Sequence, residues 1–380
     1  MTGLDELSTR MCAAIFGPLP RSDQQKWAQL YLRGLIAVEG RKTMSGIAAL
    51  VGKKTVEQNL HHFISKSSWD CQPVRRLLAQ HVDALIRPEA WVVNDMVIPK
   101  KGAHTVGVER TFVPRLGRVV NSQRAFGVWL AAEQASCPVN WRLMLPSEWA
   151  TCPVKRDRAD IPECAQAEPA TVCALNAALE MAGHWGIEPV PLIMNARDGD
   201  VPRLVAELTR RGLPFLIGID DSVEVVAAQA ASPRPADRIG DHLIKLRQPV
   251  EWWDVRACVR RLSLAATMPV SLVAGSRRQL TLVAEWSGRG PAPAALWLTN
   301  LTDPASSLVR LSKLIRRVDK DFAEVSAKVG IQDFEGRSFP GWHRHATLAS
   351  AAHAVLMTAA AGHELADETM LASSGTRSRP

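Results

Sequence analysis

The chain has 380 residues, enough for one large domain or two ordinary ones, and its 47% hydrophobic and 22% charged residues are ordinary for a soluble globular protein. No apolar run approaches the roughly 20 residues of a membrane span, and no basic stretch followed by an apolar one opens the chain, so neither a membrane anchor nor a signal peptide is expected. The net charge of +8 and the pI of about 9.3 suit a polyanionic partner, although many cytosolic proteins are equally basic.

The seven cysteines form no recognisable framework. Their number is odd, and no two of them stand in a Cys-x-x-Cys pair. This usage fits a reducing cytosol better than a disulfide scaffold or a zinc site. We therefore expect a cytoplasmic protein.

The first 85 residues predict a helical region. An apolar stripe with helical spacing runs along residues 27–38. Two short helices follow: the first contains Ile47 and ends at Gly52, and the second is expected to have Thr55 as its cap and to carry Phe63. A short helix, a glycine turn and a second short helix resemble a helix-turn-helix DNA-binding unit. Plain three-helix packing gives the same pattern.

From residue 89 the pattern changes to strands. Residues 91–98 form an apolar run that only Asn94 and Asp95 interrupt. Further strands are predicted at 106–113, 126–132 and 141–145, and a polar loop or a loosely packed helix entry at 153–170. A helix at 171–186, a strand ending at Asn195, a helix at 202–212 and a strand at 214–219 come next. This strand-helix-strand order favours an α/β layered core.

The second half of the chain reads differently. Short strands interrupted by Pro and Gly predict a β-rich insertion, and two helices at 305–328 and 341–362 close the fold. The last residues have little to bury and predict disorder. The expected organisation is a helical region (1–85), an α/β core (86–220 and 301–362), an insertion within it (221–300) and a disordered tail (363–380).

The helix predicted at 305–328 has two distinct faces. Leu314 and Val318 belong to its apolar stripe, and Asp319 falls on the boundary of that stripe. The opposite face is basic and consists of Arg310, Lys313, Arg316, Arg317 and Lys320. One interpretation turns Asp319 toward the strand ends and the basic face toward a phosphate backbone. The other is a solvated charged face with a local Asp–Lys pair.

Three smaller motifs also carry candidate residues. Lys100, Lys101 and His104 form a basic turn that suits a DNA phosphate as well as it suits simple surface charge. In the run 342–345 the two histidines are two residues apart and cannot share a helix face, so core contacts are favoured over a metal site, with Arg344 a candidate phosphate contact. Trp252, Trp253 and Trp286 could stack on an unpaired base, although core packing is the safer interpretation. No Gly-x-Ser-x-Gly elbow of a serine hydrolase is present.

Several segments follow one another in order along residues 25–360. They are Gly34-Leu35 with Gly40-Arg41-Lys42, Ser68-Trp69-Asp70, Asn94-Asp95 leading into residues 99–108, the run 145–149 and the run 341–349. In this colinear order the chain resembles a bacterial insertion-sequence transposase of the DDE class. The resemblance implies a catalytic core with an RNase H-like fold.

The resemblance also implies three acidic positions, and the chain departs from the family at each of them. The first falls on Asn94, where the family opens an Asp-Asp-Thr motif, so that Asp95 keeps only its second residue. The second falls on Asn195. The third, a glutamate within a helix motif of the family, falls on Asp319. The departures therefore cluster at the positions that carry the chemistry.

Such transposases bind two divalent ions through three carboxylates, one ion activating the attacking oxygen and the other stabilising the leaving oxygen. Mg²⁺ prefers hard anionic oxygens in near-octahedral geometry. Two amides remove two negative charges, and an aspartate in place of glutamate withdraws the third ligand by about one methylene. We therefore expect no bound metal or other cofactor and no useful cleavage.

Neighbouring acids offer an alternative. Asp95 points to the opposite strand face from Asn94, unless a bulge turns it round, and Asp198 and Asp200 follow Asn195 in a turn. With Asp319 and Mg²⁺ they would make an active transposase. The main expectation is a DNA-binding protein without cleavage activity that is associated with the nucleoid. Its DNA contacts are expected on the basic helix face, the turn at 100–104, Arg344 and the N-terminal helices. Active members of the class work as dimers, so a homodimer is left open as the assembly.

Overall fold

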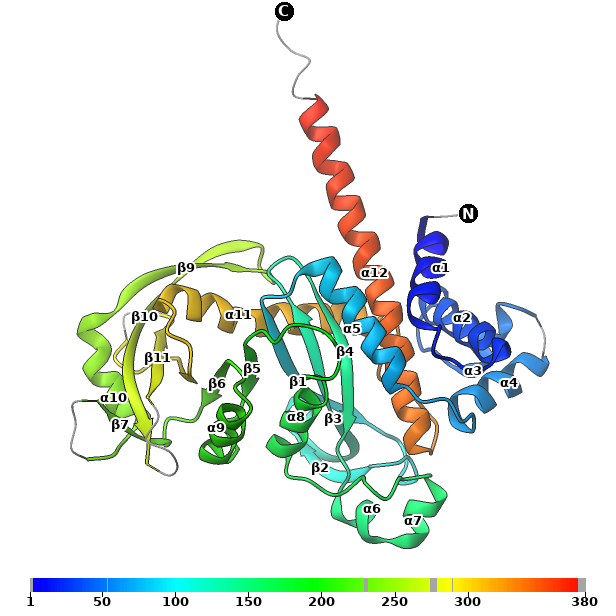
Figure 1. Ribbon diagram of the computed structural model, residues 1–380, viewed down its shortest axis with the longest axis horizontal. Coiled ribbons are helices and arrows are strands. Elements are labelled where there is room, and N and C mark those ends of the chain that lie inside the picture. The colour runs from blue at the N-terminus through cyan, green and yellow to red at the C-terminus, as the bar shows by residue number, and fades with distance from the viewer. Residues whose placement is uncertain (1–2, 53, 229–231, 274–278, 289, 375–380) are drawn as a thin grey trace, which may run out of the picture.

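The computed structural model describes residues 3–52, 54–228, 232–273, 279–288 and 290–374 (Figure 1). The N-terminal region consists of α1 (Gly3–Ile15), α2 (Ser22–Ala37), α3 (Met44–Ala49), α4 (Lys54–Ser65) and α5 (Gln72–Ile86). The predicted helical region and its turn at Gly52 are thereby confirmed. Gly52 has φ +71°, which glycine adopts at no steric cost. The cap predicted at Thr55 was wrong, because this residue lies inside α4. Thr43 caps α3 instead, accepting a hydrogen bond from the Gly46 amide at 3.0 Å.

Twelve strands of the described residues form one sheet. They are β1 (Ala90–Pro99), β2 (Glu109–Val113), β3 (Arg118–Ala131), β4 (Ser136–Leu143), β5 (Leu192–Asn195), β6 (Phe215–Ile219), β7 (Glu224–Ala227), β8 (Arg234–Pro235), β9 (Gln248–Asp254), β10 (Val259–Leu272), β11 (Leu280–Trp286) and β12 (Ala295–Thr299). Their order is β2-β3-β1-β5-β6-β12-β11-β10-β7-β8, with β4 paired to β3 and β9 paired to β10. The sheet is mixed, and helices pack on it, so the predicted α/β class is confirmed.

Strand β1, which carries Asn94, lies between β3 and β5. It runs antiparallel to β3 and parallel to β5, and β5 runs parallel to β6. Val92 of β1 is level with Ile193 of β5. The paired residues of the two strands end there, and counting on two residues along each strand brings Asn94 opposite Asn195. Because neighbours in register point to the same side of a sheet, the two asparagine side chains share one face.

The segment predicted as a β-rich insertion is β-rich, and its strands continue the central sheet. β12 pairs antiparallel with β6, β11 with β12, and β10 with β11. Figure 1 shows these strands following β5 and β6 across the molecule, with α10 (Ala236–Leu243) beside them. The backbone donors and acceptors along the free side of β6 are paired in this way, which a separate insertion would have left to water.

The helices that flank the core sheet lie on its two faces. α11 (Ala305–Asp321), which continues as a π-helical turn over Phe322–Ser326, and α8 (Ala170–Leu179) both pack on β1, β3 and β4. α9 (Val201–Arg210) contacts α8, and the long α12 (Phe339–Ser374) packs on β4 and on the N-terminal helices. Shorter helical segments are a 3₁₀ turn (Pro114–Leu116), α6 (Ser147–Thr151), α7 (Pro153–Arg158) and a 3₁₀ turn (Ile244–Leu246). α7 lies where a polar loop or a loosely packed helix entry was predicted.

The C-terminal helix is longer than predicted. A disordered tail was expected from residue 363, but α12 continues to Ser374. Residues 363–374 contain no Gly or Pro and several strong helix formers, so no local signal ends the helix. The rest of the predicted tail, 375–380, lies outside the described residues. In the part of the chain that the structure describes, no helix has the length and apolar character needed to cross a membrane.

The core is rich in tryptophan. Six tryptophan side chains are fully buried, namely Trp91, Trp129, Trp141, Trp149, Trp286 and Trp342. Of the three tryptophans considered for base stacking, Trp252 and Trp286 are buried, as the core interpretation predicts, whereas Trp253 is 42% exposed. The run 342–345 is likewise internal: His345 bridges the Tyr31 hydroxyl and the Gly330 carbonyl oxygen.

Candidate active site

Asn94 and Asp319 meet between β1 and α11. The Asn94 side chain is half-buried, and its Nδ2 donates a hydrogen bond to Asp319 Oδ1 at 3.3 Å. Among the described residues, nothing hydrogen-bonds to the buried Oδ1 of Asn94. Asp319 lies in the last turn of α11, where its neighbour Val318 is buried against the sheet. The packing of α11 on the sheet therefore holds the Asp319 carboxylate next to the Asn94 side chain.

Asn195 stands beside this pair, at the end of β5. Its side chain is exposed, and its Oδ1 accepts a hydrogen bond from the Arg197 amide at 3.2 Å. Its sheet partner on β6 is Gly218, where an added Cβ would lie 3.2 Å from the Trp297 ring and 3.5 Å from Asn195 Oδ1. The three positions predicted from the resemblance thus gather on one face of the sheet, at neighbouring strands and the helix that covers them.

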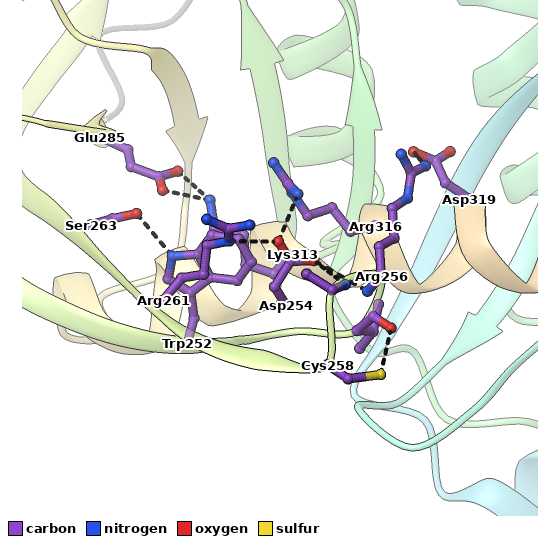
Figure 2. A network of polar contacts seen from close by, with 12 residues as sticks. Trp252, Asp254, Arg256, Cys258, Arg261, Ser263, Glu285, Lys313, Arg316 and Asp319 are labelled. Atoms are coloured by element: carbon purple, nitrogen blue, oxygen red, sulfur yellow. Dashed lines mark hydrogen bonds and ion pairs between the residues drawn. The ribbon is translucent and has the colours of Figure 1, made fainter.

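A residue that the sequence did not single out completes this group. Arg256, in the turn between β9 and β10, donates from a terminal guanidinium nitrogen to Asp319 Oδ2 at 2.9 Å. Its turn is anchored by the buried Asp254, whose Oδ1 accepts from the backbone amides of Arg256 and Ala257 at 3.1 and 3.4 Å. Figure 2 shows the Arg256 side chain reaching from this turn to Asp319. Each Asp319 oxygen is therefore occupied by a hydrogen-bond donor.

The Asp319 carboxyl experiences opposing electrostatic effects. Burial raises its pKa, because the charged form loses solvation. The positive charges of Arg256 and Arg316 act in the other direction and lower the pKa. Asp319 thus depends on the two arginines for the stability of its ionised form.

The basic face of α11 packs against the strands that follow β6, and much of it is paired with acids there. Lys313 Nζ lies 2.5 Å from Glu285 Oε1 and 4.6 Å from the centre of the Trp252 ring, and its side chain is 16% exposed. Arg317 pairs with the buried Asp321 at 3.0 Å. These two side chains are largely withdrawn from solvent, so they do not form an open surface for a phosphate backbone. Figure 2 shows the Lys313–Glu285 contact next to Trp252 of β9.

Arg316 and Lys320 differ from Lys313 and Arg317. Arg316 lies 3.4 Å from Asp254 and keeps a 46% exposed side chain. Lys320 is half-buried at the end of the helix, beside Asp319. The helix face predicted for DNA thus divides into an internal part and an accessible part near the candidate site.

The basic turn at 100–104 also has an internal and an accessible part, and Arg344 is internal. Lys100 Nζ donates to the Phe334 carbonyl oxygen at 2.7 Å, and burial lowers the pKa of its amine to about 8. Lys101 and His104 are exposed. Arg344 is 7% exposed and donates to the carbonyl oxygens of Trp69 and Ile64 at 3.0 and 3.1 Å, so its guanidinium holds α12 to the N-terminal helices.

The neighbouring acids do not join Asp319. Asp95 points to the other face of β1, where it forms an ion pair with Arg124 at 2.7 Å. The Asp198 carboxylate also acts on Arg124, and both carboxylates raise the pKa of the guanidinium. Asp200 caps α9 by accepting from the Arg203 amide at 3.1 Å. The possible substitutes therefore belong to a different face or to a helix cap.

The comparison with known families adds a second line of observation. A family model described as DDE superfamily endonuclease matches residues 14–275, more than half of the chain. The chain belongs to this family. A stretch of 117 residues is 30% identical to a probable transposase for insertion sequence element IS701 from Microchaete diplosiphon. That stretch covers 30% of this chain and 30% of the relative, so the alignment spans less than a third of the relative's length.

Within this DDE superfamily member, the matched range contains Asn94, Asn195 and Arg256 and ends before Asp319. The family implies divalent ions, and the donor set present does not fit them. Two of the three positions offer an amide, and the remaining carboxylate is bonded to Asn94 Nδ2 and Arg256. Among the described residues there is no group of three or more His, Cys, Asp or Glu side chains that could hold a metal ion.

Arg256 and its turn were missed because no local pattern marks them. The contact with Asp319 joins residues 63 positions apart, and periodicity carries no information about it. The available signal is weak: the aspartate at position 254, between two strand-like runs, favours a turn. It does not predict where the turn points.

Proposed function

We propose that this DDE superfamily member is a DNA-binding protein of insertion-sequence origin that does not cleave DNA. One observation carries the proposal: the carboxylate of Asp319 is bonded to an amide N–H at the Asn94 position and to the Arg256 guanidinium. Cleavage by two divalent ions needs several carboxylates that face the same ions. A single carboxylate already paired with a cation does not supply that charge.

The proposed DNA surface consists of the accessible basic residues near this site and on the adjoining turn. They are Arg316, Lys320, Lys101 and His104. The positive charges of Arg316, Lys320 and Lys101 neutralise backbone phosphates and release counterions, which gives sequence-independent affinity, and the exposed imidazole of His104 can donate a hydrogen bond to a phosphate. The α3–α4 unit is proposed as a further contact. Leu50 and Val51 at its turn are 52% and 43% exposed, and its inner faces are buried in the N-terminal core.

The proposal includes the fold and the setting of the protein. We take the strands β4, β3, β1, β5 and β6, with α11 across one face, as an RNase H-like core. The site then lies on two adjacent parallel strands and a covering helix, which is where the resemblance places its acids. A cytoplasmic, nucleoid-associated location and a homodimer follow from the same resemblance and remain part of the proposal.

Two measurements test the proposed function. Supercoiled plasmid incubated with the protein and Mg²⁺ or Mn²⁺ is expected to stay intact. Duplex DNA is expected to shift in the presence of EDTA, with an affinity that falls steeply as salt is raised. Metal-dependent nicking that disappears in Asp319→Ala contradicts the loss of cleavage. Absence of any shift at low salt contradicts the DNA-binding role.

A further inference from the structure

At two of the family's three acidic positions, an asparagine NH₂ group replaces one carboxylate oxygen. An ionised aspartate offers acceptors only, whereas asparagine adds an NH₂ group with two donors. Asn94 uses Nδ2 for the bond to Asp319. Asn195 engages Oδ1 with the Arg197 amide, and the described part of the chain supplies no acceptor for its exposed Nδ2. A face that would hold cations in the family therefore offers N–H groups here.

The charge around this face is positive as well. The turn at 254–256 and α11 bring three guanidinium groups, those of Arg256, Arg261 and Arg316, to two carboxylates, those of Asp254 and Asp319. Figure 2 shows this arrangement, with Arg256 and Arg316 on the side of Asp319. The group has one positive charge in excess without any metal ion.

Arg256 and Arg316 also have donors to spare. Their side chains are 52% and 46% exposed, and each makes one ion pair in the described structure. A guanidinium carries five N–H donors in a planar fork that matches phosphate oxygens, so one contact to a carboxylate leaves others free for a ligand. The position of Arg256 is fixed by its turn, because Asp254 is 3% exposed and accepts from two backbone amides there.

We propose that the former metal site is a metal-independent phosphate site, in which Arg256, Arg316 and the Asn195 amide hold a backbone phosphate of bound DNA. The proposal rests on the proposed DNA-binding function and deepens it. In the family, divalent ions supply the positive charge that faces the phosphate. Here the guanidinium groups supply it, without polarising the phosphate or activating a water molecule.

The test uses a fluorescein-labelled duplex of mixed sequence, the full-length protein and EDTA, with anisotropy read over a series of salt concentrations. Arg256→Ala is expected to weaken binding about tenfold at low salt and to lower the slope of log affinity against log salt by about 0.9, the loss of one phosphate contact. Arg256→Lys should recover most of the slope, because it keeps the charge. Asn195→Asp should weaken binding to a similar degree. It replaces the NH₂ donor with a negatively charged oxygen and leaves the size of the side chain almost unchanged.

Arg158→Ala is the matched control. Arg158 is an exposed arginine at the end of α7, outside every segment proposed to contact DNA. If the parent protein binds DNA and Arg256→Ala keeps its affinity and salt slope, or if Arg158→Ala loses as much, the phosphate site is wrong and the DNA-binding function stands. If the parent protein does not bind DNA, the function fails and the site fails with it. Circular dichroism of each variant separates loss of contact from loss of fold.

Discussion

Restoring the first acid is the most direct perturbation of the site. In Asn94→Asp a carboxylate oxygen replaces the nitrogen that lies 3.3 Å from Asp319 Oδ1. Two unit charges at that separation repel by about 5 kcal/mol at an effective dielectric constant near 20. The Asp319 side chain is 38% exposed and already faces Arg256, so solvent and the guanidinium screen much of this. We expect a net loss of about 2 kcal/mol in the free energy of unfolding.

Asn94→Ala separates charge from the lost hydrogen bond, which contributes about 1 kcal/mol. Urea unfolding near neutral pH should therefore rank the parent protein first, Asn94→Ala second and Asn94→Asp last. Repulsion between the two carboxyls raises the pKa of one of them above its unfolded value. The penalty is consequently present above that raised pKa and fades as the pH falls toward the unfolded value of about 4. The gap between the Asp and Ala variants should close on acidification.

Stabilisation by divalent ions tests the same site in a variant that carries further substitutions. Ions that bind only the folded state raise the free energy of unfolding by about 1.4 kcal/mol for each tenfold excess over the dissociation constant. Mn²⁺ should stabilise a variant that combines Asn94→Asp, Asn195→Asp and Arg256→Ala more than the parent protein. If Asn94→Asp proves as stable as the parent near neutral pH without metal, the electrostatic account of this site is refuted.

Three further predictions concern the scaffold. Burial lowers the pKa of His345 to about 4, so the unfolded chain binds a proton between about pH 6.5 and 4 that the folded protein does not. The buried His343 and His353 act in the same direction, so the test is the difference between variants: His345→Asn should lose about 3 kcal/mol less stability than the parent protein across that window, with unfolding followed by fluorescence. Arg75 is 2% exposed and donates to acceptors on β4 and α12. Arg75→Met should cost about 3–5 kcal/mol in urea, because buried acceptors lose their partner; a loss below about 1 kcal/mol would contradict this. Gly34→Ala would place a Cβ 2.3 Å from Ile47 Cγ2 and should cost about 1–3 kcal/mol; the cost should be smaller in an Ile47→Ala background, which lacks both clashing γ carbons.

The sequence predicts much of the core because its strands and helices carry clear patterns. The apolar runs at 91–98 and before Asn195 become β1 and β5, and the apolar stripe that includes Leu314 and Val318 becomes the buried side of α11. The positions of Asn94, Asn195 and Asp319 came from the resemblance, and their meeting on one face depends on the register of β1 and β5. Residue periodicity does not determine that register.

The basic face of α11 shows why the sequence does not predict the partners of its charged side chains. A helical pattern distinguishes apolar from charged residues, but it does not distinguish water from an opposing carboxylate. Lys313 is charged and yet internal, because Glu285 and the Trp252 ring cover it. Lys100 similarly follows a strand in a basic turn and is nevertheless committed to the Phe334 carbonyl oxygen. Both partners come from segments that are distant along the chain.

The Arg256–Asp319 pair has a consequence for the history of the gene. Return of a single acid at position 94 meets a carboxylate at close range, without a bound ion to offset it. Under the proposed function, a return to cleavage would need further acids and release of Asp319 from Arg256, which would leave the guanidinium without its carboxylate. The contacts that Asp319 already makes therefore oppose reversion by single mutations at positions 94 and 256.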